Sequence, residues 1–316
     1  MTRLLRLLLP LMLASVLRAE SVTVYPDWFP GAQFSGLYAA IDQGFYREQG
    51  IEVQLVPFAF GQKTAARIEA TPEQCAVAAI EGYIFLQARA RGTPWKVLAA
   101  MFQESPAGYL SLAATGIRGA ADFRGRRIGV HHHADPLYRW FLARAGVKES
   151  EATLVFTGDD IDALVRGDLH ALQGYSIEEY IRLQSRVGAA ARFVSFRTLG
   201  FDSYSELLVT SPAQVQRHGA TLERFLEATR RGWRHALAHP DSTVQSVARR
   251  MDTPPDPAHL RASLSALAPL VSPAGAAPLA PLSRAKWNRM QEAAIAMGFL
   301  EKPEPPEDFV HGSLAP

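Results

Sequence analysis

The chain has 316 residues, of which 48% are hydrophobic and 20% charged, a composition typical of a globular protein with room for two domains. Its 33 basic and 31 acidic residues give a net charge of +2 without a dense basic stripe, which argues against nucleic-acid binding. The single Cys75 excludes an intramolecular disulfide and a multi-cysteine metal site, and we expect no metal or other cofactor.

Residues 1–19 have the features of a secretory signal peptide. Arg3 and Arg6 form a charged start, and the apolar stretch that follows is too short to span a bilayer comfortably. Ala19 is a small residue suited to cleavage. We therefore expect an exported, periplasmic protein whose mature chain begins near Glu20, with an uncleaved membrane anchor as the alternative.

Residues 21–56 have the pattern of a strand, a loop, a helix and a second strand. Two valines alternate with polar neighbours, and prolines with a glycine then force a loop before apolar residues recur at helical spacing. In a βαβ unit, ligands bind at the carboxyl ends of the strands. Asp27, Trp28, Gln33 and Phe34 follow the first strand, so their loop is predicted to face a ligand, with Trp28, Gln33 and Phe34 as the contacts.

Strands and helices alternate through the next part of the chain, which predicts an α/β protein. The predicted strands are 75–80, 95–102, 128–130, 152–156, 171–173 and 192–196. The predicted helices are 63–70, 83–91, 136–145 and 161–166. Beyond Pro212 the pattern predicts mainly helices, over 222–239, 244–251, 259–267 and 284–297, with a loop at 269–281 and an extended or disordered tail after Pro303.

Several polar residues come directly after predicted strands, where they can reach the same ligand. These are Gln62, Glu81, Gln103, Ser105 and His131. His131 is followed by His132 and His133, but adjacent residues of an extended chain point to alternate sides and do not converge on one metal ion. We expect one of the three histidines to contact a ligand, and the sequence does not say which.

The order of the motifs resembles that of bacterial periplasmic solute-binding proteins. The motifs are a Trp-x-Pro loop, a Gly-Phe-Tyr turn, and the sequences FQESP (102–106), GIRGAADFRGRRIGV (116–130), GDLHALQGYSIEEYIRL (167–183) and LGFDSYSELLVTSP (199–212). They are most similar to the branch that includes thiamine-precursor (pyrimidine) binding proteins and thiamine pyrimidine synthases. Sulfonate and nitrate binders are more distant relatives of this branch.

This resemblance implies an α/β protein with the two-lobed type II periplasmic-binding-protein fold. Residues 20–105 and 205–316 would form lobe I, with a helical C-terminal tail, and residues 106–204 would form lobe II. Two hinge crossings, near Ser105–Ala113 and Phe196–Leu207, would join the lobes and allow them to close on a ligand. The implied partner is the inner-membrane permease of an ABC importer, and we expect a monomer.

The resemblance also implies ligand contacts from the second lobe and from the return crossing. Tyr175 and Glu179 match a retained Tyr and Glu, and the Glu is a ligand contact in the pyrimidine-binding relatives. Tyr204 and Glu206 match Tyr and Asp positions of the return crossing. The expected ligand is a small heteroaromatic, a thiamine-precursor pyrimidine first and a flavin second.

The same family contains enzymes, but the residues of the pyrimidine synthases are missing. Their sacrificial histidine aligns with Phe34, their Schiff-base lysine aligns approximately with Ile80, and their cysteine-rich run has no counterpart. We therefore predict a non-enzymatic receptor. A periplasmic ligand sensor paired with a separate kinase is the other hypothesis.

Overall fold

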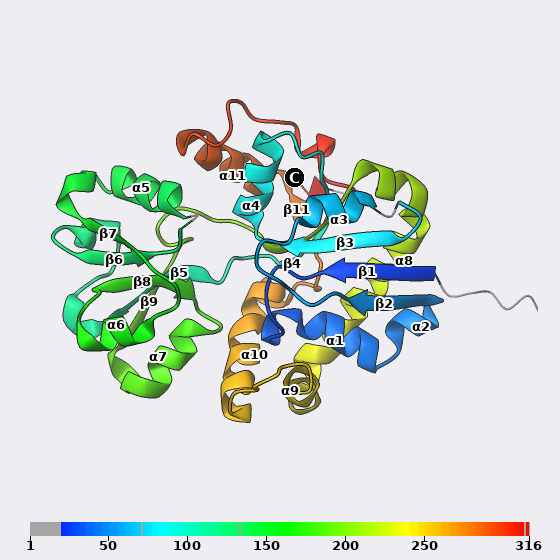
Figure 1. Cartoon of the computed structure of the whole chain (residues 1–316), viewed down its shortest axis with the longest axis horizontal. Helices are drawn as coiled ribbons and strands as arrows, with labels where there is room; N and C mark the ends of the chain where they lie inside the picture. Colours follow the sequence, from blue (N-terminus) through cyan, green and yellow to red (C-terminus); the bar gives the residue numbers. More distant parts are fainter. Residues whose placement is uncertain (1–19, 71, 133, 313, 316) are drawn as a thin grey trace, which may run out of the picture.

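The computed structural model describes residues 20–315 except 71, 133 and 313. The predicted signal peptide, residues 1–19, and His133 lie outside the described residues. The described helices include none that is both long and apolar enough to cross a membrane. Figure 1 shows two α/β lobes side by side, each built around one sheet.

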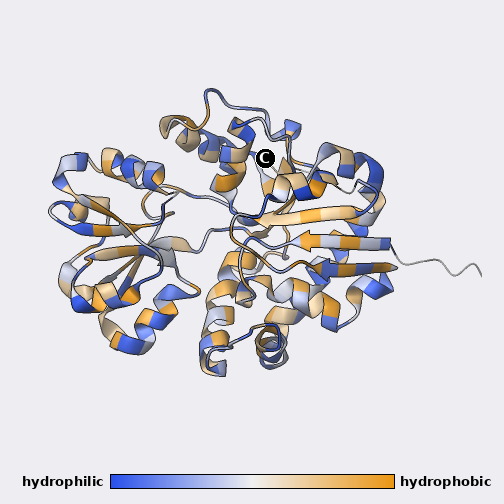
Figure 2. Ribbon diagram, viewed as in Figure 1, coloured by the Kyte–Doolittle hydropathy of each residue, from blue (hydrophilic) through white to orange (hydrophobic). Residues whose placement is uncertain are grey.

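The first sheet has five strands in the order β2-β1-β3-β10-β4. The strands are β1 (Glu20–Tyr25), β2 (Ile51–Leu55), β3 (Cys75–Ile80), β4 (Lys96–Phe102) and β10 (Ser205–Thr210). β10 runs antiparallel to β3 and β4, whereas β1 is parallel to β2 and β3. All six residues of β3 are buried because helices cover both faces of the sheet, and Figure 2 shows this strand as hydrophobic along its length.

The second sheet has five strands in the order β7-β6-β8-β5-β9. The strands are β5 (Ala107–Leu112), β6 (Arg127–Val130), β7 (Thr153–Phe156), β8 (Ala171–Tyr175) and β9 (Ala191–Ser195). The antiparallel strand is β5, between β8 and β9, so the two sheets repeat one topology. This agrees with the expected two-lobed α/β architecture.

The helices of the first sheet's lobe are α1 (Ser35–Asp42), α2 (Phe45–Glu48), α3 (Thr64–Ala70), α4 (Gly82–Ala90), α8 (Pro212–Ala238), α9 (Pro240–Ala248), α10 (Pro257–Val271) and α11 (Arg284–Ala296). Those of the second are α5 (Asp135–Arg144), α6 (Ile161–Arg166) and α7 (Glu179–Val187). α1 and α8 cross at two glycines: a Cβ on Gly232 would lie 2.1 Å from the Gly36 carbonyl oxygen. Only residues without side chains permit this backbone approach.

The chain passes between the sheets at residues 103–106 and 196–204. The first crossing is shorter than the expected Ser105–Ala113, because the apolar residues from Ala107 onward form β5 and pair with β8 and β9. The second crossing ends where Ser205 begins β10.

The C-terminal prediction was wrong, because the tail after Pro303 is packed onto the first lobe. Phe309 is buried against Phe85 and Trp287, and Val310 forms a bridge with Val97 at the edge of β4. Short strands β11 (Leu282–Ser283) and β12 (Leu314–Ala315) pair beside it. The predicted loop at 269–281 also begins later than expected, because α10 continues to the buried Val271.

Candidate functional site

Three carboxyl groups meet where strands of the first sheet end at the lobe interface. Tyr25 of β1 pairs with Ala78 of β3, so Asp27, two residues later, comes level with the end of β3 and the following Glu81. β10 runs the other way, and its Leu207 pairs with Ile80, which brings Glu206 beside Glu81. The register of three strands therefore gathers Asp27, Glu81 and Glu206, which we call the acid trio.

Hydrogen bonds hold the acid trio together. The Ser205 hydroxyl donates to Glu81 Oε1 at 2.7 Å. The Asp27 and Glu206 carboxyl groups are within hydrogen-bonding reach of each other, so one proton shared between them, donated by Glu206, joins the pair. None of the ion pairs among the described residues involves a member of the trio. The acids are thus brought together without a basic side chain to neutralise them.

This crowding shifts the protonation of all three acids. Burial raises the pKa of Asp27 to about 7, against the smaller opposing effect of backbone N–H groups at Asp27 and Glu81. Burial raises the pKa of Glu81 to about 8, with the Asp27 charge acting in the same direction. Burial, followed by the charges of Asp27 and Glu81, raises the pKa of Glu206 well above its ordinary value. At neutral pH the trio therefore retains protons that exposed carboxyl groups would have lost.

The backbone at Glu206 is in the left-handed region, with φ of 49°. A residue other than glycine is uncommon there, and such a conformation costs about 1–3 kcal/mol unless surrounding structure enforces it. The conformation interrupts the usual alternation of a strand and holds the Glu206 side chain among the other acids, where it is only 7% exposed.

The second lobe contributes Tyr175 to the same interface. Tyr175 ends β8, and the charges of Glu81 and Asp27, across the interface, act with burial to raise its pKa. Tyr83, at the start of α4, lies near both Tyr175 and Glu81. Ile177 packs into the hydrophobic core of the first lobe. The lobes are therefore in contact around the acid trio.

An exposed group of aromatic rings adjoins the trio. Trp28, Phe29, Phe58 and Phe60, from the loops after β1 and β2, have ring centroids 5.1–5.9 Å apart in six pairings, and we call them the aromatic rim. Trp28 is 52% exposed and Phe60 is 74% exposed, although most large apolar side chains of this chain are buried. Trp28 directly follows Asp27, so the loop after β1 carries both a ring of the rim and a member of the trio.

Three other residues predicted for the site form hydrogen bonds in the loops and the crossing around the acid trio. The Gln62 amide nitrogen donates to the Pro26 carbonyl at 2.9 Å, next to Asp27. Gln33 donates to the Phe29 carbonyl at 3.2 Å, beneath the aromatic rim. The Ser105 hydroxyl accepts a hydrogen bond from the Ala107 amide in the first crossing.

Four more predicted residues have structural partners. Phe34 is fully buried in the first lobe's core, and Gln103 is 9% exposed with its amide nitrogen donating to the Ala100 carbonyl. The His131 backbone amide donates to Gln173 Oε1 at 3.0 Å. The Tyr204 ring lies 5.3 Å from the Trp287 ring, and its hydroxyl accepts a hydrogen bond from the Ser283 amide.

Glu179 stabilises the start of α7. Its Oε2 accepts a hydrogen bond from the Tyr175 amide at 2.8 Å, and burial raises its pKa. Its neighbour Glu178 is exposed and accepts from His259 of α10 at 3.0 Å, which links the two lobes. Glu179 thus orients the turn that carries Tyr175.

The sequence placed Asp27 in the loop that faces the ligand, but neither Asp27 nor Tyr83 was selected as a ligand contact. Asp27 had a usable signal, since it is a carboxylate directly after a strand in a Pro-rich loop. Tyr83 gave none, because an aromatic residue at the start of an amphipathic helix is most often part of the core.

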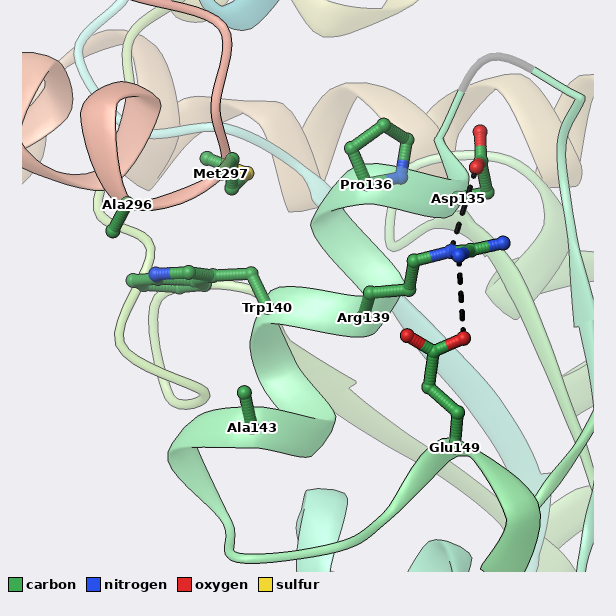
Figure 3. Close-up of a pocket in the computed structure, with 8 residues that line it drawn as sticks. All are labelled: Asp135, Pro136, Arg139, Trp140, Ala143, Glu149, Ala296 and Met297. Carbon is green, nitrogen blue, oxygen red and sulfur yellow. Dashed lines mark ion pairs between the residues drawn. The ribbon is translucent and has the colours of Figure 1, made fainter.

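A separate hollow of about 480 Å³ lies between α5 of the second lobe and the end of α11 of the first. Figure 3 shows the Trp140 ring facing Ala296 and Met297, while Arg139 pairs with Asp135 and Glu149. The acids here are neutralised by Arg139, in contrast to the acid trio. Among the described residues, no group of three or more His, Cys, Asp or Glu side chains has the arrangement needed to hold a metal ion.

Comparisons with known proteins place these features in context. The family model described as "NMT1/THI5 like" matches residues 31–243. The chain is 25% identical over 227 residues to the riboflavin-binding protein RibY of Chloroflexus aurantiacus, covering 70% of this chain and 64% of that protein. It is 24% identical over 237 residues to the formylaminopyrimidine-binding protein of Halalkalibacterium halodurans, covering 74% and 71%.

Enzymes and solved structures are also among the similar proteins. A 4-amino-5-hydroxymethyl-2-methylpyrimidine phosphate synthase of Legionella pneumophila is 21% identical over 228 residues, covering 71% of this chain and 72% of the enzyme. The periplasmic aliphatic sulphonate-binding protein SsuA of Escherichia coli superposes with a TM-score of 0.66 at 12% identity, covering 95% of this chain and 94% of SsuA. This likeness confirms the type II periplasmic-binding-protein fold.

Proposed function

Because the chain belongs to the NMT1/THI5-like family, we propose that it is a non-enzymatic, periplasmic solute-binding protein that delivers a small nitrogen heteroaromatic to an ABC importer. The ligand would lie between the two lobes, against the acid trio and Tyr175. The family and the fold support the binding role. The formylaminopyrimidine and riboflavin binders among its relatives support a flat, nitrogen-containing ring.

The observation that carries the ligand class is the acid trio. Buried carboxyl groups without basic partners accept hydrogen bonds from ring N–H and amino groups, and they offer no positive charge to balance an oxyanion. A sulfonate such as the ligands of the structurally similar SsuA proteins is therefore disfavoured. Tyr175 offers a ring face for stacking from the second lobe, worth on the order of 1 kcal/mol beyond the area it buries.

The residues that would make the protein an enzyme do not support that role. Phe34 and Ile80, at the positions of the synthase histidine and lysine, are buried apolar residues of the first lobe. Cys75 is also buried, and burial raises the pKa of its thiol to about 12, which keeps it unreactive. We therefore favour binding over synthesis.

A flavin is the second candidate ligand, and the aromatic rim favours it. Three exposed rings, those of Trp28, Phe29 and Phe60, with the half-buried Phe58, offer more stacking surface than one pyrimidine ring needs. Riboflavin therefore belongs in the first panel of ligands to be tested, beside the pyrimidines.

We expect formylaminopyrimidine to bind to the purified mature protein and to stabilise it, by roughly 2.7 kcal/mol at a hundredfold excess over its Kd. Glu81→Gln should weaken that binding by about 0.5–1.5 kcal/mol, because one acceptor oxygen for the ring amino group is lost. Calorimetry measures the affinity, and Glu73→Gln, on the exposed ion pair with Arg217, is the matched control. Tight binding of taurine or nitrate, with no binding of any heteroaromatic, would refute the proposed ligand class.

A further inference from the structure

Three buried acceptor oxygens lie together at the lobe interface without a donor. Asp27 Oδ1, Gln62 Oε1 and Glu206 Oε2 receive no hydrogen bond from a donor group in the part of the chain that the structure describes. Gln62 is held in place because its amide nitrogen donates to the Pro26 carbonyl, which leaves its oxygen facing away from that bond. Burying an acceptor without a donor is costly, so each oxygen indicates a donor that arrives with a ligand.

The buried acceptor oxygens and the exposed aromatic rim can contact two different parts of one ligand. Glu206 is 7% exposed and can contact only a group that enters the interface, whereas Phe60 of the aromatic rim is 74% exposed. The loop that carries Phe60 also carries Gln62, and Trp28 follows Asp27. A single small molecule can therefore place one end among the acceptors while its flat body rests on the rim.

Building on the proposed function, we propose that the ligand carries a nitrogen cation, a protonated amine or an amidinium, which enters the acid trio while its aromatic body contacts the rim. A cationic N–H group supplies both the donors that the three oxygens lack and the charge that the carboxylates lack. A neutral ring edge supplies the donors but no charge. An oxyanion supplies neither.

Binding of such a cation displaces the proton that Asp27 and Glu206 share. In the free protein this proton limits the negative charge of the pair. The other titratable groups that act on the pair are acidic: Glu81 on both members, Tyr175 beside Asp27 and Tyr38 beside Glu206. The basic group nearest to them, Arg250, lies over the Tyr38 ring at 4.7 Å. The incoming N–H cation takes over the role of the proton. The proton then dissociates from Glu206 and passes to the solvent. Binding of one cation should therefore release about one proton to the buffer.

The test uses two probes that differ in charge at one position. The first is 4-amino-5-aminomethyl-2-methylpyrimidine, whose aminomethyl group is protonated at neutral pH, and the second is its neutral N-formyl derivative. Titration calorimetry of the mature protein at pH 7, in two buffers of different ionisation enthalpy, measures the affinity and the number of protons released. Glu206→Gln is the test variant, and Glu73→Gln, an exposed acid paired with Arg217, is the matched control.

We expect the amine to bind at least tenfold more tightly than its formyl derivative and to release about one proton. Glu206→Gln should lower the affinity for the amine about a hundredfold and abolish the proton release, while the affinity for the formyl derivative changes less than fivefold. Equal affinities for the two probes with no proton release would overturn the cation but leave the proposed function standing. Binding of neither probe, nor of riboflavin, would overturn both, and thermal stabilisation by Mg²⁺ alone would assign the trio to a metal.

Discussion

The ligand-free protein should lose stability as the pH rises from 5.5 to 8, and Glu206→Gln should remove the part of that loss that Glu206 contributes. In the unfolded chain the three acids ionise near pH 4, whereas in the folded protein Asp27 keeps its proton until about pH 7 and Glu81 until about pH 8. Between these limits the folded state binds more protons than the unfolded state. The free energy of unfolding therefore falls with rising pH, by about 1.4 kcal/mol per pH unit for each such group.

The expected size of this loss is on the order of 3 kcal/mol across the range, because the acids interact and their effects do not add fully. Glu206→Gln replaces an acid that takes up a proton on folding with a neutral amide, so that the share of the pH dependence that Glu206 itself contributes disappears. The variant should consequently be more stable than the wild type at pH 8, although it binds the cationic probe less well. A residue that lowers the stability of the ligand-free protein and strengthens ligand binding is expected at a functional site.

Urea denaturation of both proteins at pH 5.5, 7 and 8 measures the effect. His170 and His235 act in the opposite direction, since burial lowers their pKa values and the neutral ring forms more readily in the folded state. The decisive quantity is therefore the difference between wild type and variant, in which the histidines cancel. A difference that does not change with pH would show that Glu206 does not hold its proton in the folded protein.

The order of strands and helices could be predicted from the sequence because most strands are covered on both faces. Such strands appear as short apolar runs, and CAVAAI of β3 is an example. The start of α8 at Pro212 was missed by ten residues, because its first turns carry few apolar residues. The signal that was present is the cap: the Ser211 hydroxyl accepts a hydrogen bond from the Gln214 amide.

The candidate site could be predicted only one residue at a time. Glu81 was selected because it follows a strand and Glu206 because it matches an Asp of the family's return crossing, but their meeting with Asp27 depends on the pairing register of three strands. Register is a property of distant segments, and no local pattern encodes it. Tyr204 and Glu206, two residues apart, would share a face in a regular strand. The positive φ of Glu206 breaks that relation and leaves Tyr204 in the core.

The two crossings between the lobes are joined by one buried lysine. Lys286 of α11 is 7% exposed, and its Nζ donates to the Gln103 carbonyl at 2.6 Å in the first crossing. The same Nζ donates to Asp202 Oδ1 at 2.7 Å in the second crossing. Any hinge motion of the lobes must therefore pivot around a point at which α11 holds both connections.

Lys286→Met should lower the free energy of unfolding by about 2–4 kcal/mol, because it leaves the Gln103 carbonyl and the Asp202 carboxylate without their donor. Arg289→Met is the matched control: Arg289 also pairs with Asp202, at 3.4 Å, but its side chain is 56% exposed, so its loss should cost less than about 1 kcal/mol. The double variant Lys286→Met with Asp202→Asn should recover part of the loss, because no uncompensated charge remains.

Urea denaturation at pH 7 measures the free energy of unfolding of all three variants, and scattering with saturating formylaminopyrimidine reports lobe closure. Equal effects of the two single variants would mean that Lys286 does not brace the crossings, since an ordinary surface ion pair would account for both.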